Sequence, residues 1–81
     1  MTAEEFAKKI KAAKFIKLTG DSHTRGYAVR VPTEDGKCWS MTFFIAPDQL
    51  GKRAYPDCYN KALARIAERL GYNGSLARWR K

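Results

Sequence analysis

The chain has few of the residues that build metal centres or disulfide frameworks. Its 81 residues include two cysteines, Cys38 and Cys58, and one histidine, His23. The cysteines form no C-x-x-C motif, and three soft ligands at unrelated spacings fall short of the four that a structural zinc ion requires. We therefore expect reduced thiols that are buried or half-exposed, with no metal and no cofactor.

Long apolar runs are absent as well. No stretch approaches the roughly 18 apolar residues that span a bilayer, and the first ten residues, MTAEEFAKKI, carry acids where a secretory signal carries a basic region. With 44% hydrophobic and 30% charged residues, the composition is typical of a globular domain whose length allows one modest core. The sequence predicts a single cytoplasmic domain over residues 1–81 with no membrane partner.

Acidic residues are also scarce. Eight Asp and Glu stand against sixteen Lys and Arg, which leaves a net charge of +8. Such a balance points to a polyanionic partner, although charge that only keeps a protein soluble gives the same composition. The positions of the cations must distinguish these two interpretations.

Hydrophobic periodicity predicts five elements in the order helix, strand, strand, strand, helix. Thr2 and Glu5 form a capping box before the first helix, and Pro56 fits the first position of the second, which ends at Gly71 in a left-handed cap. An Asp-Gly turn joins the last two strands as a hairpin. The expected bounds are 3–13, 14–19, 26–31, 38–46 and 56–70.

This order predicts an α+β fold, with a three-stranded antiparallel sheet and both helices on one face. The alternating and helical apolar stripes supply the expected core: Phe6, Ile10, Tyr27, Val29, Val31, Trp39, Met41, Phe43, Ile45, Leu63, Ile66 and Leu70. Strand 14–19 is expected at an exposed edge, which allows either a monomer or a homodimer paired sheet to sheet.

Three groups of side chains are candidates for binding. Lys61, Arg65 and Arg69 step four residues at a time along a helix face about 120 to 160° from the apolar stripe. Lys52 and Arg53 precede this helix, and the basic tail over residues 72–81 ends with Trp79 between Arg78 and Arg80. An ordinary solvated face explains the helical row equally well, and Trp79 either stacks on a base or packs back onto the domain.

His23 lies in the loop GDSHTRGY, between two glycines. Three interpretations remain open for it: an exposed turn residue, a contact to a ligand alongside Arg25, or a catalytic base. General acid-base catalysis needs a second group within hydrogen-bond reach, and no fixed spacing supplies one here.

The element order resembles the double-stranded-RNA-binding domain, which also has a glycine-containing loop with a histidine after its first strand. Here that segment is Gly20-Asp21-Ser22-His23, followed by TRGYAVRV and an Asp-Gly-Lys hairpin. The resemblance implies that the loop enters one minor groove, the first helix enters another, and a basic pair before the second helix contacts the phosphates between them. It assigns the loop role to His23 and the phosphate role to Lys52 and Arg53.

A second likeness concerns the stretch EEFAKKIKAAKFIKLTGDSH. It looks like the start of HicA-type messenger-RNA interferase toxins, in which a helix and a strand lead to a Gly-Ser-His with a catalytic histidine. This resemblance implies a ribonuclease that uses His23.

These observations give three hypotheses. The leading one is a non-catalytic module for duplex RNA or DNA, with mainly phosphate contacts. The second is the HicA-like ribonuclease. The third is a phage or mobile-element inhibitor that binds a protein of a host nucleic-acid-processing or defence machine, since a basic surface also fits an acidic protein.

Overall fold

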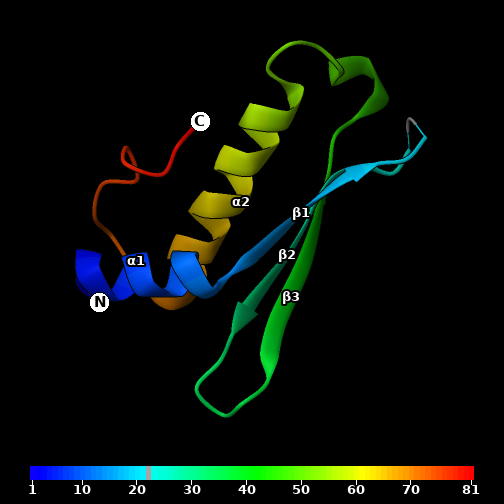
Figure 1. Cartoon of the computed structure of the whole chain (residues 1–81). Helices are drawn as coiled ribbons and strands as arrows, with labels where there is room; N and C mark the ends of the chain where they lie inside the picture. The colour runs from blue at the N-terminus through cyan, green and yellow to red at the C-terminus, as the bar shows by residue number, and fades with distance from the viewer. Residues whose placement is uncertain (22) are drawn as a thin grey trace.

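The computed structural model describes residues 1–21 and 23–81 and has the predicted order of elements (Figure 1). Ser22, which belongs to the Gly-Asp-Ser-His segment, lies outside the described residues. No helix in the described part of the chain has the length and apolar character needed to cross a membrane. The elements are α1 (Ala3–Ala12), β1 (Lys14–Thr19), β2 (Arg25–Pro32), β3 (Cys38–Phe44), a short 3-10 helix η1 (Pro47–Gln49) and α2 (Ala54–Leu70).

The three strands form one antiparallel sheet in the order β1-β2-β3. The register places Val29 opposite Phe15 on one side and Met41 on the other, so these side chains share a face. Gly36, with φ of 81°, makes the β2-β3 connection a tight hairpin, as the Asp-Gly signal predicted.

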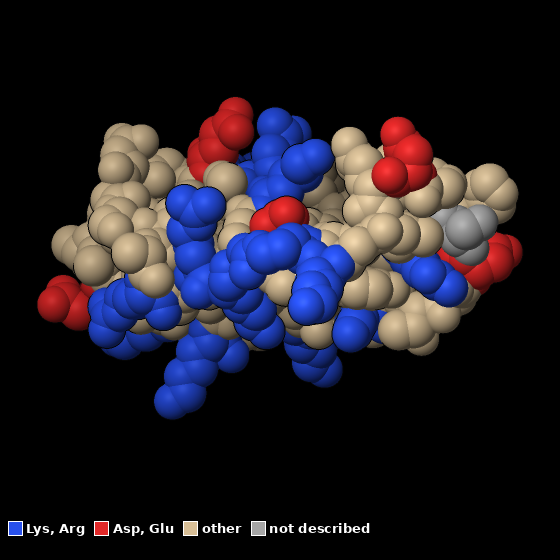
Figure 2. All heavy atoms as spheres, turned by 90° about the horizontal axis from the view of Figure 1, so that it is seen from above, with Lys and Arg blue, Asp and Glu red and all other residues tan. Residues whose placement is uncertain are grey.

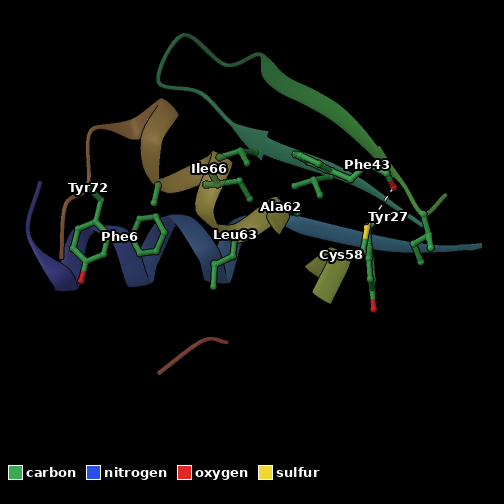
Figure 3. Packing of buried hydrophobic residues seen from close by; sticks show 12 residues of the cluster. Phe6, Tyr27, Phe43, Cys58, Ala62, Leu63, Ile66 and Tyr72 are labelled. Carbon is green, nitrogen blue, oxygen red and sulfur yellow. Dashed lines mark hydrogen bonds between the residues drawn. The ribbon is translucent and has the colours of Figure 1, made fainter. Parts of the chain in front are cut away.

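Both helices cover the same face of the sheet, and the core lies between the two layers (Figure 3). Phe6 from α1 and Leu63 and Ile66 from α2 are fully buried, together with Val29 and Val31 from β2. The opposite face of the sheet is open, since Ile16 is 48% exposed and Phe44 61% exposed. The predicted α+β architecture is therefore confirmed.

Most of the predicted core is buried. Ile10, Trp39, Met41 and Leu70 are only partly buried at its margin. The expected core left out three buried hydrophobic residues, Ala62, Ala67 and Tyr72, whereas the thiol of Cys58 is buried as expected. Cys38 is exposed, which corrects the expectation of a buried or half-exposed thiol; it lies at the first position of β3, an edge strand.

The capping box at the start of α1 is confirmed. The backbone N–H of Glu5 donates to Thr2 Oγ1 at 3.2 Å, and that of Thr2 donates to Glu5 Oε1 at 3.0 Å. The hydrogen bond from the Thr2 backbone N–H, and after it the Thr2 side chain, lower the pKa of the Glu5 carboxyl, because donors to a carboxylate favour its ionised form. Ala13 is the C-cap rather than the last helical residue.

α2 begins two residues earlier than predicted, at Ala54, with Arg53 as the N-cap. Pro56 therefore occupies the third helical position. This is tolerated because the first four backbone N–H groups of a helix have no intrahelical acceptor, so proline removes no bond there. Lys52 and Arg53 thus adjoin the helix directly. At the other end, Gly71 has φ of 77° and forms the predicted left-handed cap.

The segment after α2 packs back onto both helices. The ring of Tyr72 stacks on Phe6 at 4.3 Å between centroids, and Trp79 meets Phe6 edge to face at 4.9 Å. Farther along, the backbone N–H of Lys81 donates to Asn60 Oδ1 at 2.8 Å, and Asn60 Nδ2 donates to the Lys81 carbonyl at 3.0 Å. Residues 72–81 are therefore a docked segment, and Trp79 packs onto the domain.

Candidate nucleic-acid interface

The turn between β1 and β2 is closed by its own polar groups. Asp21 Oδ1 accepts hydrogen bonds from the backbone N–H of His23 at 2.9 Å and from Thr24 Oγ1 at 3.3 Å. Arg25 Nε donates to the carbonyl of Gly20 at 3.3 Å. The His23 side chain is exposed, and within residues 1–21 and 23–81 its imidazole has no hydrogen-bond partner. Asp21 orders the backbone here, and the histidine stands at the surface of a turn.

The strongest gathering of predicted site residues surrounds the start of α2. Arg53 Nη2 donates to Asp57 Oδ1 at 3.2 Å and to the carbonyl of Lys81 at 3.0 Å, so this side chain ties the docked segment to the helix. Lys61 and Arg80 both line a hollow of about 370 Å³ between α2 and the docked segment. Lys52 is exposed in the turn that leads into the helix.

We call Lys52, Arg53, Lys61, Arg80 and Lys81 the α2 basic cluster. Asp57 is the acidic residue that contacts this cluster, and the Asp57 carboxylate is paired with Arg53. The cluster therefore keeps an excess of positive charge at the surface.

In the helical row, Lys61 borders two hollows, one beside the docked segment and one beside Phe44 and Ile45 at the end of β3. Arg65 and Arg69 line a second hollow of about 380 Å³, together with Trp39 and Met41 of β3. Arg69 lies over the Trp39 ring, with its guanidinium carbon 5.8 Å from the centroid. Arg65 Nη1 is 3.6 Å from a carboxylate oxygen of Glu68, which also borders this hollow.

The remaining predicted residues lie along the docked segment. The Arg78 guanidinium sits 5.1 Å from the centre of the Trp79 ring, whose other contacts are with Phe6 and Tyr72. Trp79 is thus partly covered, whereas Arg78 and Arg80 remain exposed. The ring serves as an anchor for the arginines on either side.

The sequence interpretation missed two cation-aromatic contacts to α2, one from β1 and one from the docked segment. Lys17 Nζ is 4.3 Å from the centre of the Tyr55 ring, and Lys81 Nζ is 4.4 Å from that of Tyr59. Tyr55 donates its hydroxyl hydrogen to the carbonyl of Leu18 at 2.7 Å, and burial raises the pKa of Tyr59. The signal in the sequence was the alternation of β1, which places Lys17 on the same face as Phe15.

The buried thiol of Cys58 donates to the carbonyl of Phe43 at 3.6 Å (Figure 3). Burial raises its pKa, so the thiolate needed for nucleophilic chemistry is disfavoured. In the part of the chain that the structure describes, no three side chains of His, Cys, Asp and Glu gather where a metal ion would be held.

Figure 2 shows how the charges are distributed when the molecule is seen from above. Lys and Arg side chains spread across the middle of this face, and most of the Asp and Glu side chains lie toward its rim. The surface is therefore basic over a continuous area.

Comparisons with protein-family models, with curated proteins and with solved structures found no match to the chain.

Proposed function

We propose that the chain binds duplex nucleic acid, RNA in preference to DNA, through phosphate contacts made by the α2 basic cluster. The observation that carries this proposal is the docking of residues 72–81, which holds Arg80 and Lys81 beside Arg53 and Lys61. Four cations held together at the start of α2, with exposed Lys52 in the turn before it, outnumber the one paired acid, and such a surface neutralises phosphates and releases their counterions.

The arrangement of the elements supports a duplex as the ligand. The β1-β2 turn and α1 lie toward opposite ends of the molecule, with the start of α2 between them (Figure 1). The longest dimension of the domain is 36 Å, so these two ends are far enough apart to contact different parts of one duplex. Double-stranded-RNA-binding domains contact two successive minor grooves and the phosphates between them, and the resemblance noted above implies the same arrangement here. His23 and Arg25 would then lie at one groove and α1 at the other.

The proposal is tested by fluorescence anisotropy with labelled duplex RNA, duplex DNA and single-stranded RNA at several salt concentrations. Each phosphate contact contributes about 0.9 to the slope of log K against log salt, so five contacts predict a slope of about −4 to −5 on duplex. Absence of binding to any nucleic acid at low salt would refute the proposal.

A matched pair of double variants tests where the contacts lie. Lys61→Gln with Arg80→Gln removes two charges from the cluster and is expected to lower the magnitude of the salt slope by about 2. Arg30→Gln with Lys37→Gln removes the same charge from the open sheet face and the hairpin, and should leave the slope close to that of the parent. Equal losses in the two variants would show that only net charge matters.

The same RNA, recovered and run on a gel, tests the ribonuclease alternative. His23 is exposed and no second catalytic group contacts its imidazole among the described residues, so we expect intact RNA. Cleavage that His23→Ala abolishes, with binding retained, would instead assign the histidine a catalytic role.

A further inference from the structure

β3 is an edge strand without the usual protection. It lies at one end of the sheet order β1-β2-β3, and its seven residues, CWSMTFF, contain no charge and no proline. Proteins normally protect free strand edges with charged side chains, proline or bulges, because exposed N–H and C=O groups recruit further strands. The opposite edge, β1, carries Lys14 and Lys17. An unprotected edge of this length is suited to pairing with another strand.

Two hollows lie beside this edge, between β3 and α2, and we call them together the β3-α2 groove. The first, about 410 Å³, is bordered by Phe44 and Ile45 on one side and by Lys61 on the other. The second, about 380 Å³, has Trp39 and Met41 on one side and Arg65 and Arg69 on the other. The end of β3 thus lies beside the first half of α2 and its start beside the second half, so the cations of the helix follow the length of the strand.

The spacing of these cations matches an extended peptide. Residues four apart on a helix are separated by about 6 Å along its axis, and alternate residues of a strand by about 6.6 Å. Lys61, Arg65 and Arg69 therefore span about the same length as three acidic residues at alternate positions of an added strand. Only Asp57 and Glu68 bring negative charge to this groove among the described residues, and each already contacts an arginine.

From these observations we propose that the β3 edge binds an extended acidic segment of a partner protein by strand addition. The main chain of the segment pairs with β3, and its alternate carboxylates meet Lys61, Arg65 and Arg69. Main-chain pairing supplies affinity in this mode, and the charge spacing supplies selectivity. A second copy of the chain fits poorly, because pairing two β3 edges brings two rows of like charge toward each other. A nucleic-acid strand lacks the alternating amide donors and acceptors that the edge offers.

The groove shares Arg53 and Lys61 with the α2 basic cluster, but the two proposals are tested with different ligands and different double variants, so failure of one is distinguishable from failure of the other. The probe is an acetylated and amidated heptapeptide of alternating threonine and glutamate, titrated into isotopically labelled protein up to millimolar concentration while amide chemical shifts are followed by NMR. We expect shifts concentrated in residues 38–44 and little binding of a peptide with glutamine in place of glutamate. A peptide N-methylated on alternate residues, which cannot donate to the edge, should not bind.

The decisive variant is Arg65→Glu with Arg69→Glu, expected to weaken peptide binding by about tenfold or more, since two ion pairs become two repulsions. The control, Lys8→Glu with Lys11→Glu on the exposed side of α1, makes the same change in net charge and should alter binding less than about threefold. The proposal would be overturned if the two double variants lost peptide affinity equally, if the chemical-shift changes lay outside β3, or if the N-methylated peptide bound as well as the parent peptide. So would concentration-dependent dimerisation that perturbs residues 38–44, or stronger perturbation of these residues by single-stranded RNA.

Discussion

The contact between Trp79 and Phe6 attaches the docked segment to the folded domain. The substitution Trp79→Ala tests how much this contact stabilises the domain. Complete truncation of a buried tryptophan costs about 3 to 5 kcal/mol, and Trp79 is half-buried, so burial accounts for roughly half of that. The edge-to-face contacts with Phe6 at 4.9 Å and Tyr72 at 6.1 Å fall within the range of stabilising aromatic pairs. We therefore expect a loss of about 2 kcal/mol, which for a domain of this size lowers Tm by about 8 to 16 °C.

Thermal and urea unfolding followed by circular dichroism measure this loss directly. Trp79→Phe, which keeps a ring against Phe6, should lose less than half as much and serves as the control. The alternative interpretation of the sequence, in which Trp79 is free to stack on a base, makes the opposite prediction. Stability within about 0.5 kcal/mol of the parent, combined with weaker binding to nucleic acid, would refute the packing argument.

Three further predictions concern the backbone and the thiols. Gly26→Ala should destabilise the domain by about 3 kcal/mol or more in urea unfolding, because φ is 154° and a Cβ would overlap the backbone of β3; Gly51→Ala, where a Cβ meets nothing within 4 Å, should cost under about 1 kcal/mol. Thr2→Ala removes a cap from α1 and should cost about 1 kcal/mol in the same assay, a value that an unchanged midpoint would contradict. In the native protein, a thiol reagent should modify exposed Cys38 quickly and buried Cys58 only after unfolding; equal rates would show that the thiol of Cys58 is accessible.

Elements governed by local pattern were predictable from the sequence. The alternation of β2 and β3 and the turn glycine Gly36 depend on residues within a few positions of one another, and so do the caps at Thr2 and Gly71. The start of α2 was not predictable in this way. Proline is compatible with any position of the first helical turn, and the sequence alone does not say which position Pro56 occupies.

Contacts between distant segments were not predictable in the same way. Phe6 and Trp79 come from opposite ends of the chain, and no periodicity relates them. Both packing and base stacking suit a tryptophan flanked by arginines, so the local sequence did not distinguish them. The candidate site shows the same division. The basic residues before and within α2 were found from their spacing, whereas Lys81 and its place beside Arg53 depend on the course of the docked segment.

The small size of the domain connects its stability to its proposed binding surface. A chain of this length buries a limited core, and Tyr72 and Trp79 pack against Phe6, which is completely buried. The same packing fixes the backbone that carries Arg80 and Lys81 before any ligand arrives. Ordering a long side chain on binding costs about 0.5 to 1.5 kcal/mol of conformational entropy. Anchoring the backbone of that side chain in advance reduces the entropy that is lost on binding. Loss of the aromatic anchor should therefore weaken phosphate binding even though no charge is removed, and the salt slope should fall along with the stability.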